Sequence, residues 1–151
     1  MLNPFPMFAA YNAWANRRLY AAAAAIPDVD YRADRGAFFG SLHGTLNHLV
    51  VTDRIWMRRF TGEGPVHTAL DDQPYDDLAS LEAARIAEDE RISAYISGLD
   101  EERLAGIIVY QTITNPRGVR QPLAEALFHL FNHQTHHRGQ AHTLLTIIGG
   151  H

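Results

Sequence analysis

The sequence has 151 residues, of which 46% are hydrophobic and 20% are charged, and its formal net charge is -4 at pH 7. This acidic balance argues against a nucleic-acid partner, because binding to a phosphate backbone depends on clustered cations. The chain contains no cysteine and no lysine, which excludes disulfides, thiolate metal ligands and a Schiff-base mechanism.

The first half of the chain predicts two helices. Residues 4–26 are rich in alanine and aromatic residues and are followed by Pro27, which indicates a first helix. Residues 27–40 read as a connection that contains one irregular turn. Apolar residues then recur close to every 3.6 positions, which predicts a second helix over residues 41–61.

The second half predicts two further helices and a small hairpin. Apolar residues repeat at helical spacing over residues 77–98, before Gly98. β-branched residues on both sides of the 115–118 turn predict a short irregular hairpin within residues 107–121. Pro122 suits a helix start and the glycines after Ile148 suit a helix end, so residues 122–148 are expected to form the last helix.

These elements together predict an all-α fold, a four-helix bundle with long connections, in one domain spanning residues 1–151. The acid-rich stretch from Asp71 to Glu102 is interpreted as a solvated face. No long uncharged apolar run or leader pattern occurs, so we expect a cytoplasmic protein that does not enter a membrane. The apolar surface of so small a bundle also favours a homodimer.

The density of histidine on the last helix is the most informative feature of the sequence. Five of the nine histidines lie between His129 and His142. On a helix, His129, His133 and His137 form one stripe, whereas His136 points about 100° away from His137. Imidazoles four residues apart converge on one point, and His133 with His137 lies nearest the expected apolar face. This pair is the preferred candidate for a metal site.

A third ligand must come from another element, and the second helix offers His43 and His48. These residues are about 140° apart around the helix, so only one of them can face the pair on the last helix. Each borders the apolar face, and the pattern alone does not choose between them. If His43 is not the ligand, it is expected at the surface. The remaining histidines are also expected there: His67, His129, His136, His142 and His151.

Two charged residues are candidates for supporting the metal ligands. Asp53 falls near the middle of the apolar face of the second helix, where an unpaired carboxylate would be costly. It is expected to accept a hydrogen bond from the distal nitrogen of a ligand histidine or to pair with Arg138. The structural alternative is a buried ion pair that fixes the register of the helices. On the first helix, Asn12 and Asn16 are expected either to line the metal cavity or to face solvent.

Three segments resemble the DinB-like proteins, which are related to the YfiT group. They are YNAWANRRL at Tyr11–Leu19, LNHLVVTDRIW at Leu46–Trp56 and NHQTHHRGQAHTLL at Asn132–Leu145, and the similarity covers nearly the whole chain. The family shares its name with an unrelated translesion DNA polymerase, which requires clustered carboxylates and a much larger chain. The sequence does not resemble that polymerase.

The resemblance implies an antiparallel up-down-down-up bundle that holds one divalent transition-metal ion through three histidines. Carried over to this chain, the ligands are His48, His133 and His137, and the preference for His48 over His43 depends on this resemblance. Imidazole ligands suit several metals, and zinc or nickel is the expected occupant. Similar proteins include a mycothiol-dependent isomerase and bacillithiol S-transferases, which use low-molecular-weight thiols.

A three-histidine site leaves a coordination position for water or substrate, which is typical of catalytic rather than structural metal sites. We therefore expect a metal-dependent enzyme that acts on a small molecule. Thiol S-transfer is the favoured reaction, and the thiol must be external because the chain has no cysteine. A metal-dependent hydrolase is an alternative, as is a noncatalytic stress-response or binding scaffold that the metal stabilises.

Overall fold

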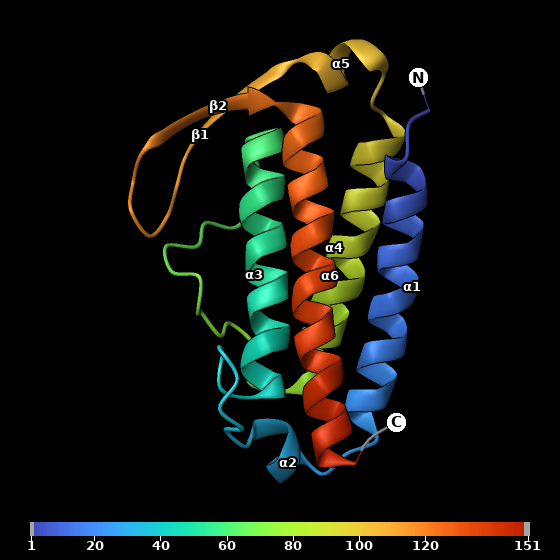
Figure 1. The fold of residues 1–151 in the computed structure, drawn as a ribbon, viewed down its shortest axis with the longest axis vertical. Helices are drawn as coiled ribbons and strands as arrows, with labels where there is room; N and C mark the ends of the chain where they lie inside the picture. Colours follow the sequence, from blue (N-terminus) through green and yellow to red (C-terminus); the bar gives the residue numbers. More distant parts are fainter. Residues whose placement is uncertain (1, 150–151) are drawn as a thin grey trace.

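Four long helices, α1 (Phe5–Ala24), α3 (Leu42–Thr61), α4 (Leu78–Ser97) and α6 (Leu123–Ile148), run side by side along the molecule (Figure 1). The structure is a computed structural model and describes residues 2–149. Each long helix begins and ends within two residues of the bounds predicted from the sequence.

The long helices form an up-down-down-up bundle. Helices α1 and α6 run in one direction and α3 and α4 in the other, and each helix packs against one parallel and one antiparallel neighbour (Figure 1). The parallel pair α3 and α4 is joined by residues 62–77, which cross back along the outside of α3. The predicted all-α bundle is therefore confirmed.

Short elements close the two ends of the bundle. Helix α2 (Asp28–Arg32) lies in the first connection, and α5 (Glu101–Ala105) precedes a hairpin of β1 (Ile107–Gln111) and antiparallel β2 (Gly118–Pro122). The hairpin agrees with the sequence prediction. The two five-residue helices were not predicted, because so short a segment cannot display a helical repeat of apolar residues.

Local signals explain where the site-bearing helices start and stop. The Ser41 hydroxyl accepts a hydrogen bond from the Gly44 amide at 2.9 Å, which satisfies a free donor in the first turn of α3. Gly62 ends α3 and Gly149 ends α6, with φ of 76° and 95°, which is the left-handed backbone that glycine adopts without strain. These signals fix both ends of α3 and the end of α6, the two helices that carry the histidines.

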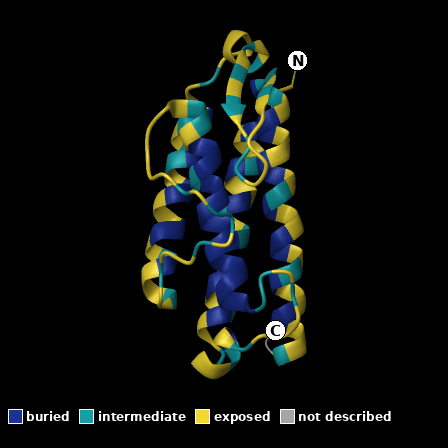
Figure 2. Ribbon diagram, turned by 90° about the vertical axis from the view of Figure 1, so that its left-hand side faces the viewer, coloured by how far each residue is buried: buried dark blue, intermediate teal, exposed yellow. Residues whose placement is uncertain are grey.

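The bundle interior contains two hydrophobic clusters separated by a polar layer. Leu46 and Leu145 belong to one cluster and Trp56 and Leu127 to the other. Buried residues line the inner faces of the helices and exposed residues their outer faces (Figure 2). The polar layer between the clusters includes both charged and amide side chains: Asn12, Asn16, Asp53, Arg85, Asp89, Gln134 and Arg138.

The interpretation of residues 71–102 as a solvated face was therefore wrong for part of α4. Glu88 and Asp89 are buried, with 5% and 7% of their surface exposed, and each has a guanidinium partner. An acidic composition alone does not reveal this burial, because Asp89 also contacts Asn12 and Asn16 of α1, which lie 77 and 73 residues away along the chain. Within residues 2–149, every helix is too short or too polar to cross a membrane.

Candidate metal centre

Three histidines converge between α3 and α6. His48 comes from the middle of α3, and His133 and His137 come from successive turns of α6. One ring nitrogen of each residue lies within 4.8 Å of those of the other two. The Nε2 atoms of His48 and His133 are 3.3 Å apart. The structure thus brings together the three residues that the sequence nominated as metal ligands.

Hydrogen bonds orient two of the three rings. The Nδ1 atom of His48 lies 2.7 Å from the Leu70 carbonyl oxygen, and that of His137 lies 2.7 Å from Oε1 of Gln140. Both oxygens can only accept, so each Nδ1 carries the proton and each Nε2 is left with its lone pair. The buried Nδ1 of His133 has no hydrogen-bond partner in the described chain, so the protein does not fix its tautomer.

The three imidazoles are held in their neutral, metal-ligating form. Burial lowers the pKa of His48 to about 4 and that of His133 to about 3, and the neighbouring His137 contributes to both shifts. Burial also lowers the pKa of His137. At neutral pH the cluster therefore presents unprotonated nitrogens, the state that binding to a transition metal requires.

The spacing of the nitrogens suits a tetrahedral metal ion. Two ligand nitrogens each about 2.0–2.1 Å from a tetrahedral zinc are about 3.3–3.4 Å apart. The observed separation of 3.3 Å between Nε2 of His48 and Nε2 of His133 matches this value. Two lone pairs at this distance repel each other unless a cation or a proton lies between them. The residues present therefore fit a divalent metal ion.

Phe39, from the connection before α3, covers one face of the cluster. Its ring stacks on His48 with centroids 3.8 Å apart and meets His137 edge-on at 5.5 Å. Gly44 permits this approach, because a Cβ atom there would lie 2.2 Å from the Phe39 carbonyl oxygen. Phe39, Leu70 and Gln140 were missed by the sequence reasoning. Only the FF pair in the first connection gave any hint of an aromatic cover.

A cavity of about 570 Å³ opens beside His48 and His133, between α3, α6 and the β1–β2 hairpin. Its walls also include Thr52 and Leu70, and it extends to the aromatic rings of Trp56 and Tyr110. This volume lies within the range typical of small-molecule sites, about 300–1,000 Å³. The histidine cluster thus borders a space that a substrate can enter.

The competing histidine of α3 lies elsewhere. His43 is buried, and its Nδ1 is 3.0 Å from the hydroxyl oxygen of Tyr31 in α2. The expectation that His43 would lie at the surface was wrong, because the unpredicted helix α2 covers it. His43 contributes no nitrogen to the cluster of His48, His133 and His137.

The remaining histidines lie outside the cluster. His67, in the connection after α3, is half-buried, with its Nδ1 3.5 Å from a carboxylate oxygen of Asp72. His151 lies outside the described residues. Three histidines of α6 are exposed, as predicted: His129, His136 and His142.

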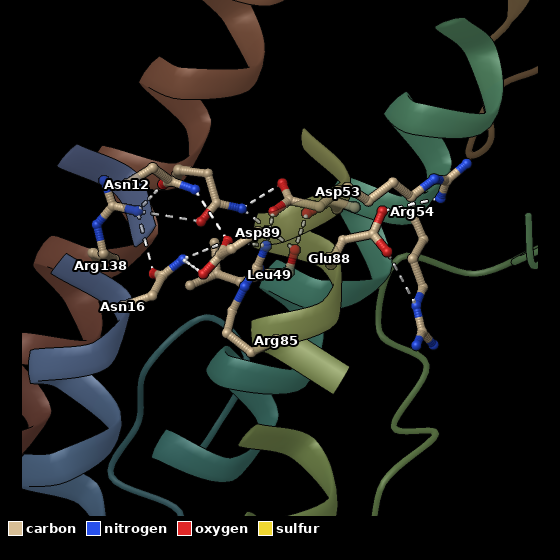
Figure 3. A network of polar contacts seen from close by, with 12 residues as sticks. Asn12, Asn16, Leu49, Asp53, Arg54, Arg85, Glu88, Asp89 and Arg138 are labelled. Carbon is tan, nitrogen blue, oxygen red and sulfur yellow. Dashed lines mark hydrogen bonds and ion pairs between the residues drawn. The ribbon is translucent and has the colours of Figure 1, made fainter. Parts of the chain in front are cut away.

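Asp53 pairs with a residue that the sequence did not nominate. Its Oδ2 lies 2.5 Å from Nη2 of Arg85 in α4, and its Oδ1 accepts a hydrogen bond from Gln134 (Figure 3). Arg138, the predicted partner, is linked to Asp53 through Gln134, whose Oε1 lies 3.3 Å from Nη1 of Arg138. The described contacts of Asp53 include no ligand histidine, so the expected contacts with a ligand histidine and with Arg138 were wrong. The remaining alternative, a buried ion pair, is confirmed, with Arg85 as the partner.

The pairing makes Asp53 part of a four-helix polar layer. Burial raises the pKa of Asp53 to about 6, and the charge of Arg85 opposes that rise. Arg85 also contacts Oδ1 of Asp89 at 2.8 Å. Burial alone would lower the pKa of Arg85, but the two carboxylates raise it overall, so the guanidinium stays charged.

The asparagines of α1 complete the polar layer. Asn16 donates to both carboxylate oxygens of Asp89 at 3.1 Å, and Asn12 accepts a hydrogen bond from Arg138 (Figure 3). Both asparagines are 1% exposed and neither lines the cavity beside the histidines, so both expectations for them were wrong. Arg138 supports this layer rather than a metal ligand.

Comparisons with known proteins agree with this architecture. The family model described as "DinB family" matches residues 1–151. The chain is 24% identical over 147 residues to Protein DinB of Bacillus subtilis strain 168, covering 92% of this chain and 83% of that protein. The fold is similar to the crystal structure of a DinB-like protein from Bacillus cereus ATCC 10987, with a TM-score of 0.69 and 18% identity over 95% of this chain and 92% of the other.

Proposed function

The chain belongs to the DinB family, and we propose that it is an enzyme that uses one divalent transition-metal ion, held by His48, His133 and His137, to act on a small molecule. The observation that carries this proposal is the convergence of three neutral imidazoles at the edge of a cavity. Zinc or nickel is the proposed metal, since both accept imidazole nitrogen.

The surroundings of the cluster support a catalytic rather than a purely structural role. Structural metal sites are closed by four protein ligands, whereas catalytic sites keep a position open to water or substrate. Here three histidines would supply the ligands, and the cavity of about 570 Å³ reaches two of them, His48 and His133. A metal ion bound there would supply a Lewis acid that lowers the pKa of a thiol or a water molecule.

Thiol S-transfer is the reaction that we propose. The three ligands are neutral, so they leave the charge of a bound divalent ion available to stabilise an anionic sulfur. The chain has no cysteine, so the sulfur must come from a low-molecular-weight thiol. The residues that line the cavity include no carboxylate, the usual general base of metal-dependent hydrolases, and this favours thiol transfer over hydrolysis.

The test compares two histidine substitutions on α6. His137→Ala removes one proposed ligand, whereas His142→Ala removes an exposed histidine five residues later. Metal content is measured by elemental analysis, folding by circular dichroism, and activity by consumption of electrophiles with a panel of bacterial thiols. We expect His137→Ala to stay folded while it loses metal and turnover, and His142→Ala to retain both.

Two results would contradict the proposal. A folded, metal-free His137→Ala protein with full turnover would show that the histidine cluster is not catalytic. If metal removal unfolded the bundle and no thiol or hydrolytic substrate reacted, the noncatalytic scaffold would be the better description.

A further inference from the structure

The cavity beside the histidines has a cationic far wall. Besides the histidines, its lining includes two charged side chains, Arg59 from α3 and Arg117 from the loop of the β1–β2 hairpin. No aspartate or glutamate lines it. A site of this composition attracts anions, because every formal charge on its wall has the same sign.

Arg59 is held in place by aromatic rings while its charge remains unpaired. The guanidinium carbon lies 4.5 Å from the ring centroid of Trp56 and 4.2 Å from that of Tyr110. Its Nη2 donates a hydrogen bond to the Gln111 carbonyl oxygen at 3.2 Å. Neither Arg59 nor Arg117 has an ion pair with a carboxylate in residues 2–149. A fork of N–H donors therefore stays available to a ligand.

Burial makes this unpaired charge costly. Arg59 is half-buried, and burial lowers the pKa of its guanidinium. An anion seated against Arg59 would relieve this cost, because it supplies both a counter-charge and acceptors for the free donors. The two aromatic rings restrict the side chain in advance, which reduces the entropy lost when a ligand binds.

The helix sets the length of a ligand that reaches both ends of the cavity. His48 and Arg59 are eleven residues apart on α3, which corresponds to about 16 Å along the helix axis. Side chains on a helix lean toward its N-terminus, and the long Arg59 side chain reaches further in that direction than the shorter side chain of His48, which shortens this separation. The two chemical ends of the cavity are thus separated by roughly 10 Å, and Ile55 and Ile113 supply apolar surface along its wall.

We propose that the substrate is an elongated anionic thiol, with its sulfur at the histidine cluster and a carboxylate bound by Arg59 and Arg117. This inference rests on the proposed function, because it assumes that the sulfur is drawn to a metal ion held by the histidines. It adds the charge and length that the substrate needs, which the histidine cluster alone does not specify.

The test uses two probes of equal length that differ only in charge, mercaptooctanoate and mercaptooctanamide. Their dissociation constants are measured by calorimetry on protein loaded with zinc, and cobalt-loaded protein reports sulfur coordination through its charge-transfer absorption. We expect the acid to bind at least about tenfold more tightly than the amide, in line with a charge-assisted bidentate contact. Arg59→Gln should reduce this preference to less than about twofold, with the amide affinity and the zinc content unchanged.

Matched variants separate a specific contact from a general effect of charge. Arg58→Gln removes the same charge one residue earlier, where the side chain is exposed and lies outside this cavity, and should keep the full preference. Arg117→Gln tests the second guanidinium without changing the helix and should reduce the preference in part.

The outcomes distinguish this inference from the proposed function. Equal binding of acid and amide to zinc-loaded protein, or equal losses in Arg58→Gln and Arg59→Gln, would overturn the anionic-substrate inference alone. If the protein bound no metal, the proposed function would fail, and the inference that rests on it would fail with it.

Discussion

The ring of Phe39 lies flat on the imidazole of His48, with centroids 3.8 Å and planes 21° apart. Phe39 also meets His137, so one residue from a connecting segment contacts two of the three proposed ligands. Contacts that orient metal ligands typically change metal affinity by about 10–100-fold when they are removed.

Phe39→Ala is expected to weaken zinc binding about tenfold, because His48 loses the surface that holds its ring. The dissociation constant is measured by competition with a chromogenic chelator. Phe38→Ala is the matched control, since the adjacent phenylalanine is 84% exposed, and it should leave the affinity unchanged. Equal affinities for both variants would show that the stacked ring does not support the site.

Gln140 offers a second test of ligand orientation. Its Oε1 accepts the Nδ1 proton of His137 at 2.7 Å, which leaves the opposite nitrogen free. Gln140→Leu should weaken zinc binding about tenfold relative to the unchanged protein. Gln140→Glu should maintain or strengthen zinc binding, because a carboxylate is a better acceptor. If both variants bound zinc equally, the hydrogen bond would have no part in holding the ligand.

Breaking the buried ion pair should cost more stability than breaking a surface pair. Asp53→Asn leaves the Arg85 guanidinium with one carboxylate fewer in a buried layer, and we expect a loss of about 3 kcal/mol in the free energy of unfolding. Urea unfolding at pH 7.5 measures it. Asp28→Asn removes the partner of Arg32 at the surface and should change little. A neutral effect of Asp53→Asn would show that Gln134 and Asp89 suffice without this charge.

The metal-free protein should lose stability as the pH falls below about 6.5. Burial lowers the pKa of His48 to about 4 and of His133 to about 3, so between these values and their normal pKa the unfolded chain binds more protons than the folded one. Stability therefore rises with pH across this window. Urea unfolding of chelator-treated protein at a series of pH values measures the slope.

A double variant isolates the contribution of these histidines. The raised pKa of Asp53, about 6, acts in the opposite direction over part of the same window, because there the folded state binds the additional proton. Replacing His48 and His133 together with glutamine leaves Asp53 in place. The double variant should show a flatter dependence on pH, and an unchanged slope would exclude the two histidines as its cause.

Periodicity was sufficient to locate the four long helices and the pair of His133 and His137. It could not choose between His43 and His48, since both border the apolar face of α3. In the structure that choice depends on Tyr31 and on the Leu70 carbonyl, which come from a short helix and an irregular connection. Neither segment has a repeat from which its position could be predicted.

The ion-pair partner of Asp53 could not be predicted from the sequence either. Arg85 lies in a stretch where arginine and acidic residues alternate, which is the ordinary pattern of a solvated helix. Its burial depends on Asp53 and Asp89 lying at the same level of the bundle. From the sequence alone, a buried charged residue cannot be distinguished from an exposed one, because the position of its counter-charge is not known.

The hydrogen bond between Gln134 and Asp53 has a consequence for how the histidine cluster is assembled. Apolar helix faces can slide past each other by one turn, about 5.4 Å, and still bury similar surface. A slide of α3 against α6 would separate Gln134 from Asp53 and leave the Gln134 amide nitrogen and one carboxylate oxygen of Asp53 buried without these partners. Gln134 directly follows His133, so the contact that forbids sliding also sets the height of His133 opposite His48. The cluster is therefore positioned by the axial alignment of two helices, before any ion binds.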